Sequence, residues 1–350
     1  MVTTAKTIRV SDDDVTYYTL PGNSGEMTDD MGQIVDTIFG QTFESNQPGL
    51  VGWSINANAL YKGFAGYVAS LKKISGAPTS TTGEACSLLT GKRYQIDDAS
   101  KQIWDRTGTI VVYDNAVDHT ADVVLIDYLN GIVEFDSGYT VTGSVTVDVD
   151  YYTMATVAKG RSFTLTQQTA AIDDTDFETA QANSGHRTFE AAGLRTLALE
   201  IAGVYDATNT FRTELLTRGE FIIEIAPGGS TLTEAYARGF FKYTGRSQSG
   251  DVGALEEETI NFNCSVPVDD LLETPFKWVF PGTATISPGL QKIMEAWQNQ
   301  TNLYVRYLPD GAAGWEGQAV VSEASISGGL EVMNEFTVSL QGDGQASAYP

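Results

Sequence analysis

Apolar and polar residues alternate along most of this chain with the period of two that is typical of β-strands. In SVTVDVDYY, the alternation puts Val145, Val147, Val149 and Tyr151 on one face of a single strand. Further strands are predicted at TIVVYD, SFTLTQQ, TLALEIAG, FIIEIAPG and FTVSLQG. The pattern therefore predicts a mainly β protein.

One pair of strands carries a strong hairpin signal. VVLIDYLNGIVEF, at residues 123–135, places two β-rich runs on either side of Asn130-Gly131. A two-residue hairpin turn of this kind needs positive φ at both central residues, which Asn and Gly tolerate best. We expect a tight turn at this pair.

Two short helices interrupt the strands, and the later one has the clearer pattern. Ser287 can serve as its N-cap, with Pro288 at the first helical position. The apolar stripe that follows at helical spacing consists of Leu290, Ile293, Met294 and Trp297. A weaker helix begins near Thr208 or Asn209 and ends at Gly219, with Phe211, Leu215 and Leu216 on its apolar face. Each helix is expected to pack on a sheet.

The two helices open a repeated unit. FIIEIAPGG at 221–229 is matched by LYVRYLPDG at 303–311, an offset of 82 residues. After a loop that differs by four residues, 239–264 overlays 317–342 at an offset of 78, so that Ser249-Gly250 falls on Ser327-Gly328. The shared order of helix, strand and long hairpin indicates two copies of one supersecondary unit.

A fainter echo lies upstream, where DTIF at 36–39 resembles DTDF at 174–177 and WSINANALY at 53–61 resembles LALEIAGVY at 197–205. Two tandem domains follow from it, each a β-sandwich or barrel with one flanking α-helix, and one of them is discontinuous. The predicted parts are an N-terminal arm at 1–35, domain one at 36–68 and 272–344, an inserted small β module at 83–152, domain two at 160–268 and a C-terminal tail at 345–350.

Charge narrows the choice of partners. The chain holds 45 acidic and 21 basic residues, a net charge of −24. Clustered Lys and Arg are needed to grip nucleic-acid phosphates or an anionic membrane, so both partners are disfavoured. Two interpretations stay open: a surface charged for solubility, or one that lies near DNA without holding it. The start MVTTAKTIRVSDDD has no apolar stretch of a signal peptide and no run is long enough to span a membrane, which indicates synthesis in the cytoplasm.

The residues give little material for catalysis. Only His119 and His186 occur, both in expected turns, and Cys86 and Cys264 are expected to be free buried thiols. Nucleophile-elbow, phosphate-loop and dinucleotide motifs are missing. Four acidic runs do not match a calcium loop and are expected to be solvated, with Ca²⁺ left open: 12–14, 29–30, 173–176 and 256–258. We predict no enzyme, no cofactor and no metal.

Four segments of the chain resemble the major tail tube proteins of long, flexible-tailed (siphovirus-type) bacteriophages. They are GQTFESNQPGLVGWSINANALYKGFAGYV at 40–68, TLTQQTAAIDDTDFETAQANSG at 164–185, ARGFFKYTGRSQSGDVGALEEETINFNCSVP at 237–267 and VVSEASISGGLEVMNEFTVSLQG at 320–342. The last two resemble the terminal hairpin of that family, with its small-residue elbow. The inserted region has no such resemblance.

The resemblance implies a virion protein whose sheets join edge to edge into rings, and the rings stack into a tail tube for DNA. It implies contacts with a tape measure protein and with tail terminator and tail tip proteins, assembly in the host cytoplasm, and passage of double-stranded DNA without specific binding. Two domains per chain would give a trimeric pseudo-hexamer, with a hexamer as the alternative. The hairpin residues expected between subunits or rings are Gly245, Arg246, Ser249, Gly250, Asp251, Leu255, Ser327, Gly328, Gly329 and Leu330.

Other classes stay open at this point. A capsid-decoration protein or an adhesin built of β-sandwiches would need aromatic-rimmed loops and need not polymerise. A virion-associated hydrolase would need a pocket where His, Glu or Asp converge.

Overall fold

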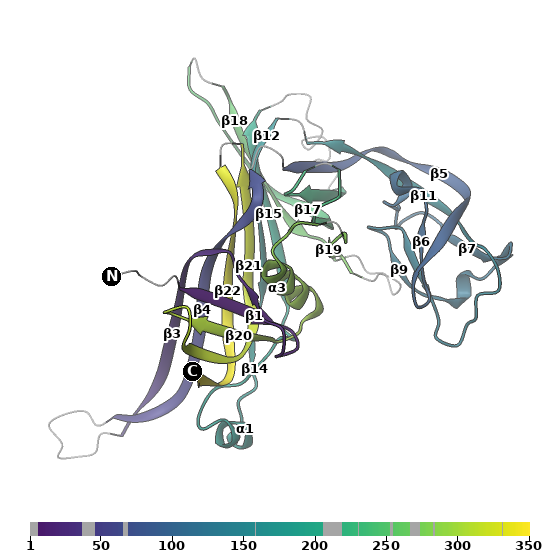
Figure 1. Ribbon diagram of the computed structural model, residues 1–350. Helices are drawn as coiled ribbons and strands as arrows, with labels where there is room; N and C mark the ends of the chain where they lie inside the picture. Colours follow the sequence, from purple (N-terminus) through teal and green to yellow (C-terminus); the bar gives the residue numbers. More distant parts are fainter. Residues whose placement is uncertain are drawn as a thin grey trace.

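The computed structural model describes residues 6–36, 46–65 (62–65 as backbone only), 69–157, 159–205, 219–229, 231–252, 255–266, 274–282, 284–330 and 332–350. Within them the chain is mainly β, as the alternation predicts, and nearly all strands join one antiparallel network. Figure 1 shows a tall body of long strands on the left and a smaller group of strands, β5 to β11, projecting to the right.

The body is built on a path of paired antiparallel strands. We name its first four strands unit one and its last four unit two. Unit one runs β3 (Gly22–Val35), β4 (Asn46–Ala65), β22 (Val332–Tyr349) and β21 (Gly314–Gly329). Unit two continues with β12 (Gly160–Thr169), β15 (Arg195–Val204), β18 (Glu257–Cys264) and β17 (Tyr236–Ser249).

Shorter strands extend each unit at the same place. β20 (Leu303–Leu308) pairs with β21, followed by β1 (Thr7–Ser11) and β2 (Tyr18–Thr19). β16 (Glu220–Ala226) pairs with β17, which also pairs with β19 (Phe276–Val279). A two-stranded sheet of β13 (Ile172–Asp173) and β14 (Phe189–Glu190) flanks the short helix α1 (Phe177–Ala182).

The described strands between β4 and β12 form the projecting module. Its strands are β5 (Ser70–Thr90), β6 (Arg93–Ile96), β7 (Val111–Asp114), β8 (Val117–Asp118), β9 (Val123–Asp127), β10 (Ile132–Phe135) and β11 (Val145–Thr156), with 3-10 turns η2 (Ala99–Lys101) and η3 (Thr120–Asp122). β5 pairs with β16 at its start and with β11 and β6 further on, so the body and the module share one continuous strand.

The two units have matching registers, which can be followed as rows of directly opposite residues. One row crosses unit two as Arg246–Ile260–Ile201–Phe163. The corresponding row crosses unit one as Ala324–Val338–Ala57–Gly25. At the sequence offsets given above, Arg246 and Ile260 correspond to Ala324 and Val338, and Ile201 corresponds to Ala57.

The short strands obey the same correspondence. Phe221 of β16 lies opposite Phe241, and Leu303 of β20 lies opposite Ala319. Both pairs are related by the offsets of 82 and 78 residues. The division into two tube domains and a module at 83–152 stays a prediction, which these registers support. The β5–β11 ladder reaches back to Lys72, before the predicted start of the module.

Helix α3 (Pro288–Asn299) lies where the apolar spacing predicts it, and the four residues of its stripe are buried. Ser287 is its N-cap residue, but its side chain makes no capping hydrogen bond, contrary to expectation. The Ser287 hydroxyl lies 3.5 Å from the Thr19 carbonyl instead. The helix predicted to start near 208, with Phe211 and Leu215, lies outside the described residues.

The hairpin β9–β10 forms as predicted, but its turn is longer than expected. Asp127 lies opposite Ile132, so the connection spans residues 128–131. Gly131 takes a positive φ of 63°, whereas Asn130 does not, which contradicts the two-residue turn. The Asp127 carboxylate bonds the side-chain amide and backbone N–H of Asn130, and these bonds close the longer loop.

Two apolar cores stabilise the fold, and β16 and β17 contribute to both. The larger core lies inside the body and includes Phe221, Ile223 and Phe241. The smaller core fills the module and includes Ile222 and Phe240 from the opposite faces of the same strands. Burial on both faces explains why FIIEIA does not alternate: its residues are apolar on both faces except for the buried Glu224.

Candidate assembly edges and polar face

The long sheet turns one face to the larger core and leaves the other polar. Ser, Thr, Asn and Gln dominate this second face, which we call the polar face. Its outward-pointing charged residues in the strands with described side chains are Glu26, Asp30, Glu200, Glu257, Glu323, Glu335 and Lys242. Six carboxylates against one ammonium give this face the sign that repels phosphate groups.

Cross-strand bonds keep these side chains in order. The Gln168 amide donates to the Glu323 carboxylate at 3.0 Å, across the β12–β21 boundary. The Asn58 amide donates to the Ser24 hydroxyl at 3.0 Å, across β4 and β3. The polar face is therefore continuous from unit one into unit two.

The joint between the units is a regular antiparallel ladder. Seven successive pairs join β12 to β21, from Ser162 opposite Gly329 to Gln168 opposite Glu323. The Leu330 N–H donates to the Arg161 carbonyl just beyond the last pair. The joint thus connects two equivalent four-stranded units through a backbone ladder, with the Gln168–Glu323 side-chain bond at one end.

Two strand edges on the path have no partner among the described strands. β3 pairs on one edge with β4, and no described strand pairs with its other edge. β17 pairs with β16 only as far as Lys242, which leaves the same edge open at residues 243–249. Figure 1 shows β3 at the left margin of the body and the β17–β18 hairpin at its top. Open edges of this length promote pairing with another chain.

The hairpin residues singled out by sequence fall into two environments. Ser249, Gly250, Asp251 and Leu255 are exposed near the β17–β18 tip, and Gly245 and Arg246 are half-buried along the same strand. Gly328 and Gly329 are buried because β12 covers them, Ser327 is half-buried in the same joint, and Leu330 is exposed at its tip. The second set is thus mostly used inside this chain.

The small-residue elbow has a steric cause. A Cβ on Gly328 would lie 2.2 Å from Asn334 Oδ1 and 2.9 Å from Phe163 Cε1. A Cβ on Gly250 would lie 2.8 Å from Glu256 Cγ. Both hairpins therefore require glycine for close approach, although neither residue takes a positive φ.

Arg246 is held by contacts within its own unit, among them a hydrogen bond to the Gln248 side chain at 2.7 Å. Its guanidinium pairs with the carboxylate of Glu258 and lies 5.3 Å from the ring centroid of Tyr205. Glu258 is buried, which corrects the expectation that the whole 256–258 run is solvated. The contacts hold Arg246 near the open edge of β17.

Large apolar side chains are exposed at both ends of the body, and the sequence reasoning missed most of them. One group lies at the tips of the β17–β18 and β21–β22 hairpins, with Val252, Leu255, Leu330, Val332 and Met333. The other lies near α1 and at the end of β3, with Phe177, Ile34 and Val35. Phe177 is 99 % exposed. The signal that could have found α1 is its capping box, in which Asp176 and Thr179 bond each other's backbone N–H groups.

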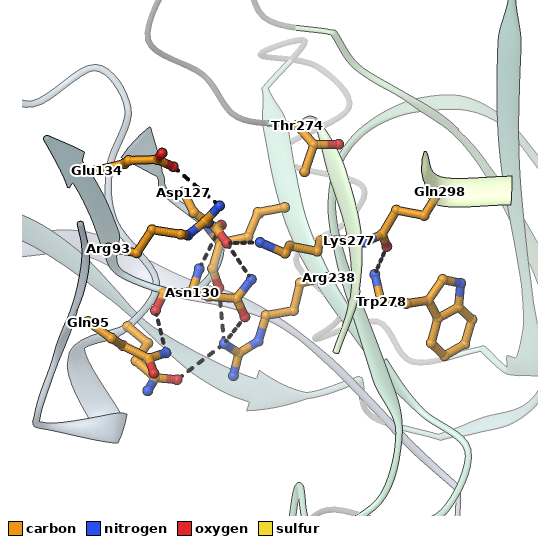
Figure 2. A network of polar contacts seen from close by, with 12 residues as sticks. Arg93, Gln95, Asp127, Asn130, Glu134, Arg238, Thr274, Lys277, Trp278 and Gln298 are labelled. Atoms are coloured by element: carbon orange, nitrogen blue, oxygen red, sulfur yellow. Dashed lines mark hydrogen bonds and ion pairs between the residues drawn. The ribbon is translucent and has the colours of Figure 1, made fainter. Parts of the chain in front are cut away.

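A buried polar network fixes the module to the body (Figure 2). The Arg238 guanidinium on β17 pairs with Glu224 on β16 at 2.8 Å and donates to the Leu129 carbonyl at 3.0 Å and to Asn130 Oδ1 at 3.2 Å. Lys277 on β19 pairs with Asp127 at 2.9 Å. The 127–131 turn of the module is therefore held by cations of the body.

The two cysteines and two histidines lie outside the features described so far. Burial raises the pKa of the Cys86 and Cys264 thiols to about 12, and both are free and half-buried. His119 Nδ1 lies 2.9 Å from Asp122, and His186 Nδ1 lies 2.8 Å from the Asn183 carbonyl. Within the described ranges no three His, Cys, Asp or Glu side chains converge as metal ligands. No described helix is long and apolar enough to cross a membrane.

Comparison with solved structures gives partial likenesses, among them chains from two gene transfer agent (GTA) particle structures. No family model and no curated protein matches the chain. A chain from the tail of an empty GTA particle, computed with helical refinement in C6 symmetry, has a TM-score of 0.29 and 17 % identity over 37 % of this chain and 87 % of that chain. A chain from the virion of a native gene transfer agent (GTA) particle has a TM-score of 0.29 and 17 % identity over 36 % of this chain and 88 % of that chain. Likeness at this level does not define a function.

Proposed function

We propose that this chain is a structural protein of a phage-type virion tail that polymerises into stacked rings, and that the rings form a hollow tube through which DNA passes. The single observation that carries the proposal is the joint between units one and two. Inside one chain, two equivalent four-stranded units already join edge to edge, and among the described strands the outer edge of β3 and residues 243–249 of β17 have no partner. A chain with this design can extend the same sheet through further copies.

The width of the sheet favours three chains in a ring. Each chain contributes eight strands to the path, so three chains give 24. At about 4.8 Å per strand and a tilt of about 40°, such a barrel has a diameter of roughly 50 Å between backbones. Six chains would double this diameter and leave a lumen far wider than a DNA duplex. We therefore favour a trimeric ring of six units over a hexamer.

The polar face would line the lumen. The six carboxylates among its described side chains repel the phosphates of transiting DNA, and the one described lysine there offers little release of counterions. Ser, Thr, Asn and Gln keep the wall wetted without strong binding. The acidic net charge of the chain then serves passage as well as solubility.

Stacking of the rings would use the two ends of the body. The hairpin tips at one end expose Val252, Leu330 and Val332, and the other end exposes Phe177 and Ile34. Apolar groups at opposite ends suit a head-to-tail contact, which repeats without closing and so builds a tube.

Electron microscopy of the purified full-length chain at rising concentration tests the proposal. Stacked hollow rings are expected, and class averages with three-fold symmetry would support two units per chain. Six-fold averages with one chain per sixth would keep the tube and exclude the trimer. Monomers alone at all concentrations, even with tail tips added as nuclei, would refute the tube.

The lumen assignment has its own test. The double variant E200K/E323K should leave assembly intact and make the tubes retain duplex DNA in a salt-dependent manner. E178K on α1 gives the same type of charge change away from the polar face and should retain none. Equal DNA retention by both variants would contradict the assignment.

A second candidate, a capsid-decoration or adhesin protein, is favoured by the projecting module alone. Such a protein would bind its target through the module as a monomer. To test this candidate, the purified full-length chain is added to capsids or to cells. Saturable binding without ring formation would support it.

A further inference from the structure

The joint inside the chain predicts the joint between chains. In the internal joint, β21 closes unit one and β12 opens unit two, and their seven-pair ladder carries no bulge. The matched rows place β17 in unit two where β21 lies in unit one. They also place β3 in unit one where β12 lies in unit two.

The open edges cover the segments that this correspondence requires. The ladder segment of β21, residues 323–329, corresponds to residues 245–251, which begin on the open edge of β17. The ladder segment of β12, residues 162–168, corresponds to residues 24–30 of β3, which is also free of bulges. Among the described strands, the two edges that correspond to the internal joint are thus the two left open at the margins.

We propose that β3 of one copy pairs antiparallel with β17 of a second copy, in the register that sets Asp29 opposite Arg246. The partner is a second copy of this chain, and the inference rests on the proposed ring-forming function. The ladder then runs from Ser24 opposite Asp251 to Asp30 opposite Gly245.

Charge at the two edges fits this register. In the internal joint, Gln167 lies opposite Ala324, a neutral pair. At the corresponding places of the open edges, Asp29 and Arg246 carry opposite charges. Directly opposite charges of unlike sign stabilise a ladder, whereas like charges destabilise it.

The remaining acidic residues avoid one another. Glu26 falls opposite Ser249, Asp30 falls opposite Gly245, and the Asp251 carboxylate falls opposite Ser24. No like-charged pair lies directly opposite in the ladder. Met27, half-buried on the core side, then packs behind the new joint as Leu165 packs behind the internal one.

The hairpin tip supports the same pairing. Inside the chain the exposed Leu330 is fixed because its N–H donates to the Arg161 carbonyl. Val252 holds the corresponding place at the β17–β18 tip and is fully exposed in the single chain. The Asn23 carbonyl of the second copy corresponds to that of Arg161 and would receive the Val252 N–H.

Disulfide cross-linking in assembled rings tests the register. Thr28 and Ser247 are exposed and fall directly opposite on the polar face, so T28C/S247C should form a disulfide between chains on mild oxidation. T28C/Q248C is the control shifted by one residue, which points to the other face. T166C/S325C places the same pair of positions in the internal joint, where the residues lie opposite each other, and should form its disulfide within one chain. Non-reducing gels and peptide mapping distinguish the products.

The expected result is loss of the monomer band for T28C/S247C alone, with covalent oligomers up to the number of chains in a ring. Rings that form without this cross-link, while T166C/S325C closes, would overturn the pairing and leave the proposed function standing. Equal cross-linking of the shifted control would overturn the register. If neither rings nor cross-links form, the pairing falls together with the proposed function.

Discussion

The buried pair of Arg238 and Glu224 gives the sharpest prediction about stability. Their side chains are 3 % and 2 % exposed. Replacing Arg238 with Met removes the guanidinium and leaves the Glu224 carboxylate buried with Lys72 as its remaining cation, at 3.0 Å. Breaking a buried ion pair on one side costs about 3–5 kcal/mol, because the stranded charge keeps its desolvation penalty.

R238M also removes two hydrogen bonds to the module, and the total loss of stability can be measured. The Leu129 carbonyl and Asn130 Oδ1 lose the donor that holds the module turn. At about 2–4 °C per kcal/mol for a cooperative unit of this size, we expect a fall in Tm of about 10 °C for R238M. Hydrogen exchange should speed up most at residues 127–131. Circular dichroism melts and exchange mass spectrometry measure both effects.

Two matched variants make the reasoning refutable. The double variant E224M/R238M replaces the pair by apolar side chains and should recover most of the lost stability, because no charge is stranded. R93M breaks the partly exposed pair with Glu134, at 3.5 Å in the same region, and should cost less than about 1 kcal/mol. If R238M melts like the wild type, or E224M/R238M melts no higher than R238M, the network does not hold the module as described.

Three further predictions concern other parts of the chain. G328A should lower the free energy of unfolding in urea by about 1–3 kcal/mol, because the added Cβ has no room. G245A should be close to neutral, because its Cβ would meet only one atom, at 4.0 Å. Equal losses for both variants would contradict the steric explanation of the elbow. The high pKa of Cys86 and Cys264 keeps both side chains as thiols at pH 8. A thiolate-specific reagent should therefore label them slowly in the native chain and fast in urea. Rapid labelling of the native chain would refute their burial. Burial raises the pKa of Asp343, so the folded chain binds that proton more tightly than the unfolded chain and loses stability as pH rises above 3.8. The Tm of D343N minus the Tm of the wild type should therefore increase from pH 4 to pH 7. A difference in Tm that stays constant over this range would contradict the prediction.

Local patterns in the sequence predict the strands well and their neighbours poorly. The alternation in 145–151 is reproduced as burial of Val145, Val147 and Val149 on one face of β11. The apolar residues on both sides of β16 indicate burial on both faces, but no local pattern shows that the second cover is an inserted module. The Asn-Gly pattern predicts a turn from the backbone preference of Asn130. It does not show that the Asn130 side chain lies in the buried network.

The candidate assembly surface was only half visible in the sequence. Repetition of the hairpins identified residues 245–255 and 327–330, because the equal spacing of the two copies can be read directly from the amino-acid sequence. β3 was missed, since GNSGEMTDDMGQIV is polar and resembles an exposed arm. Its role depends on pairing with β4 and on an edge that stays open, and both are properties of the folded sheet.

The shared strands of body and module limit how this chain can change over time. Ile222 and Phe240 point into the module, and Glu224 and Arg238 are buried beneath it. A chain that lost residues 70–157 would expose two large apolar side chains and a charged pair on the outer wall of its body. The module therefore cannot be inserted or deleted without matching substitutions in β16 and β17 of the body. A related chain without it should carry small or polar residues at the places of Ile222 and Phe240, whichever lineage it comes from.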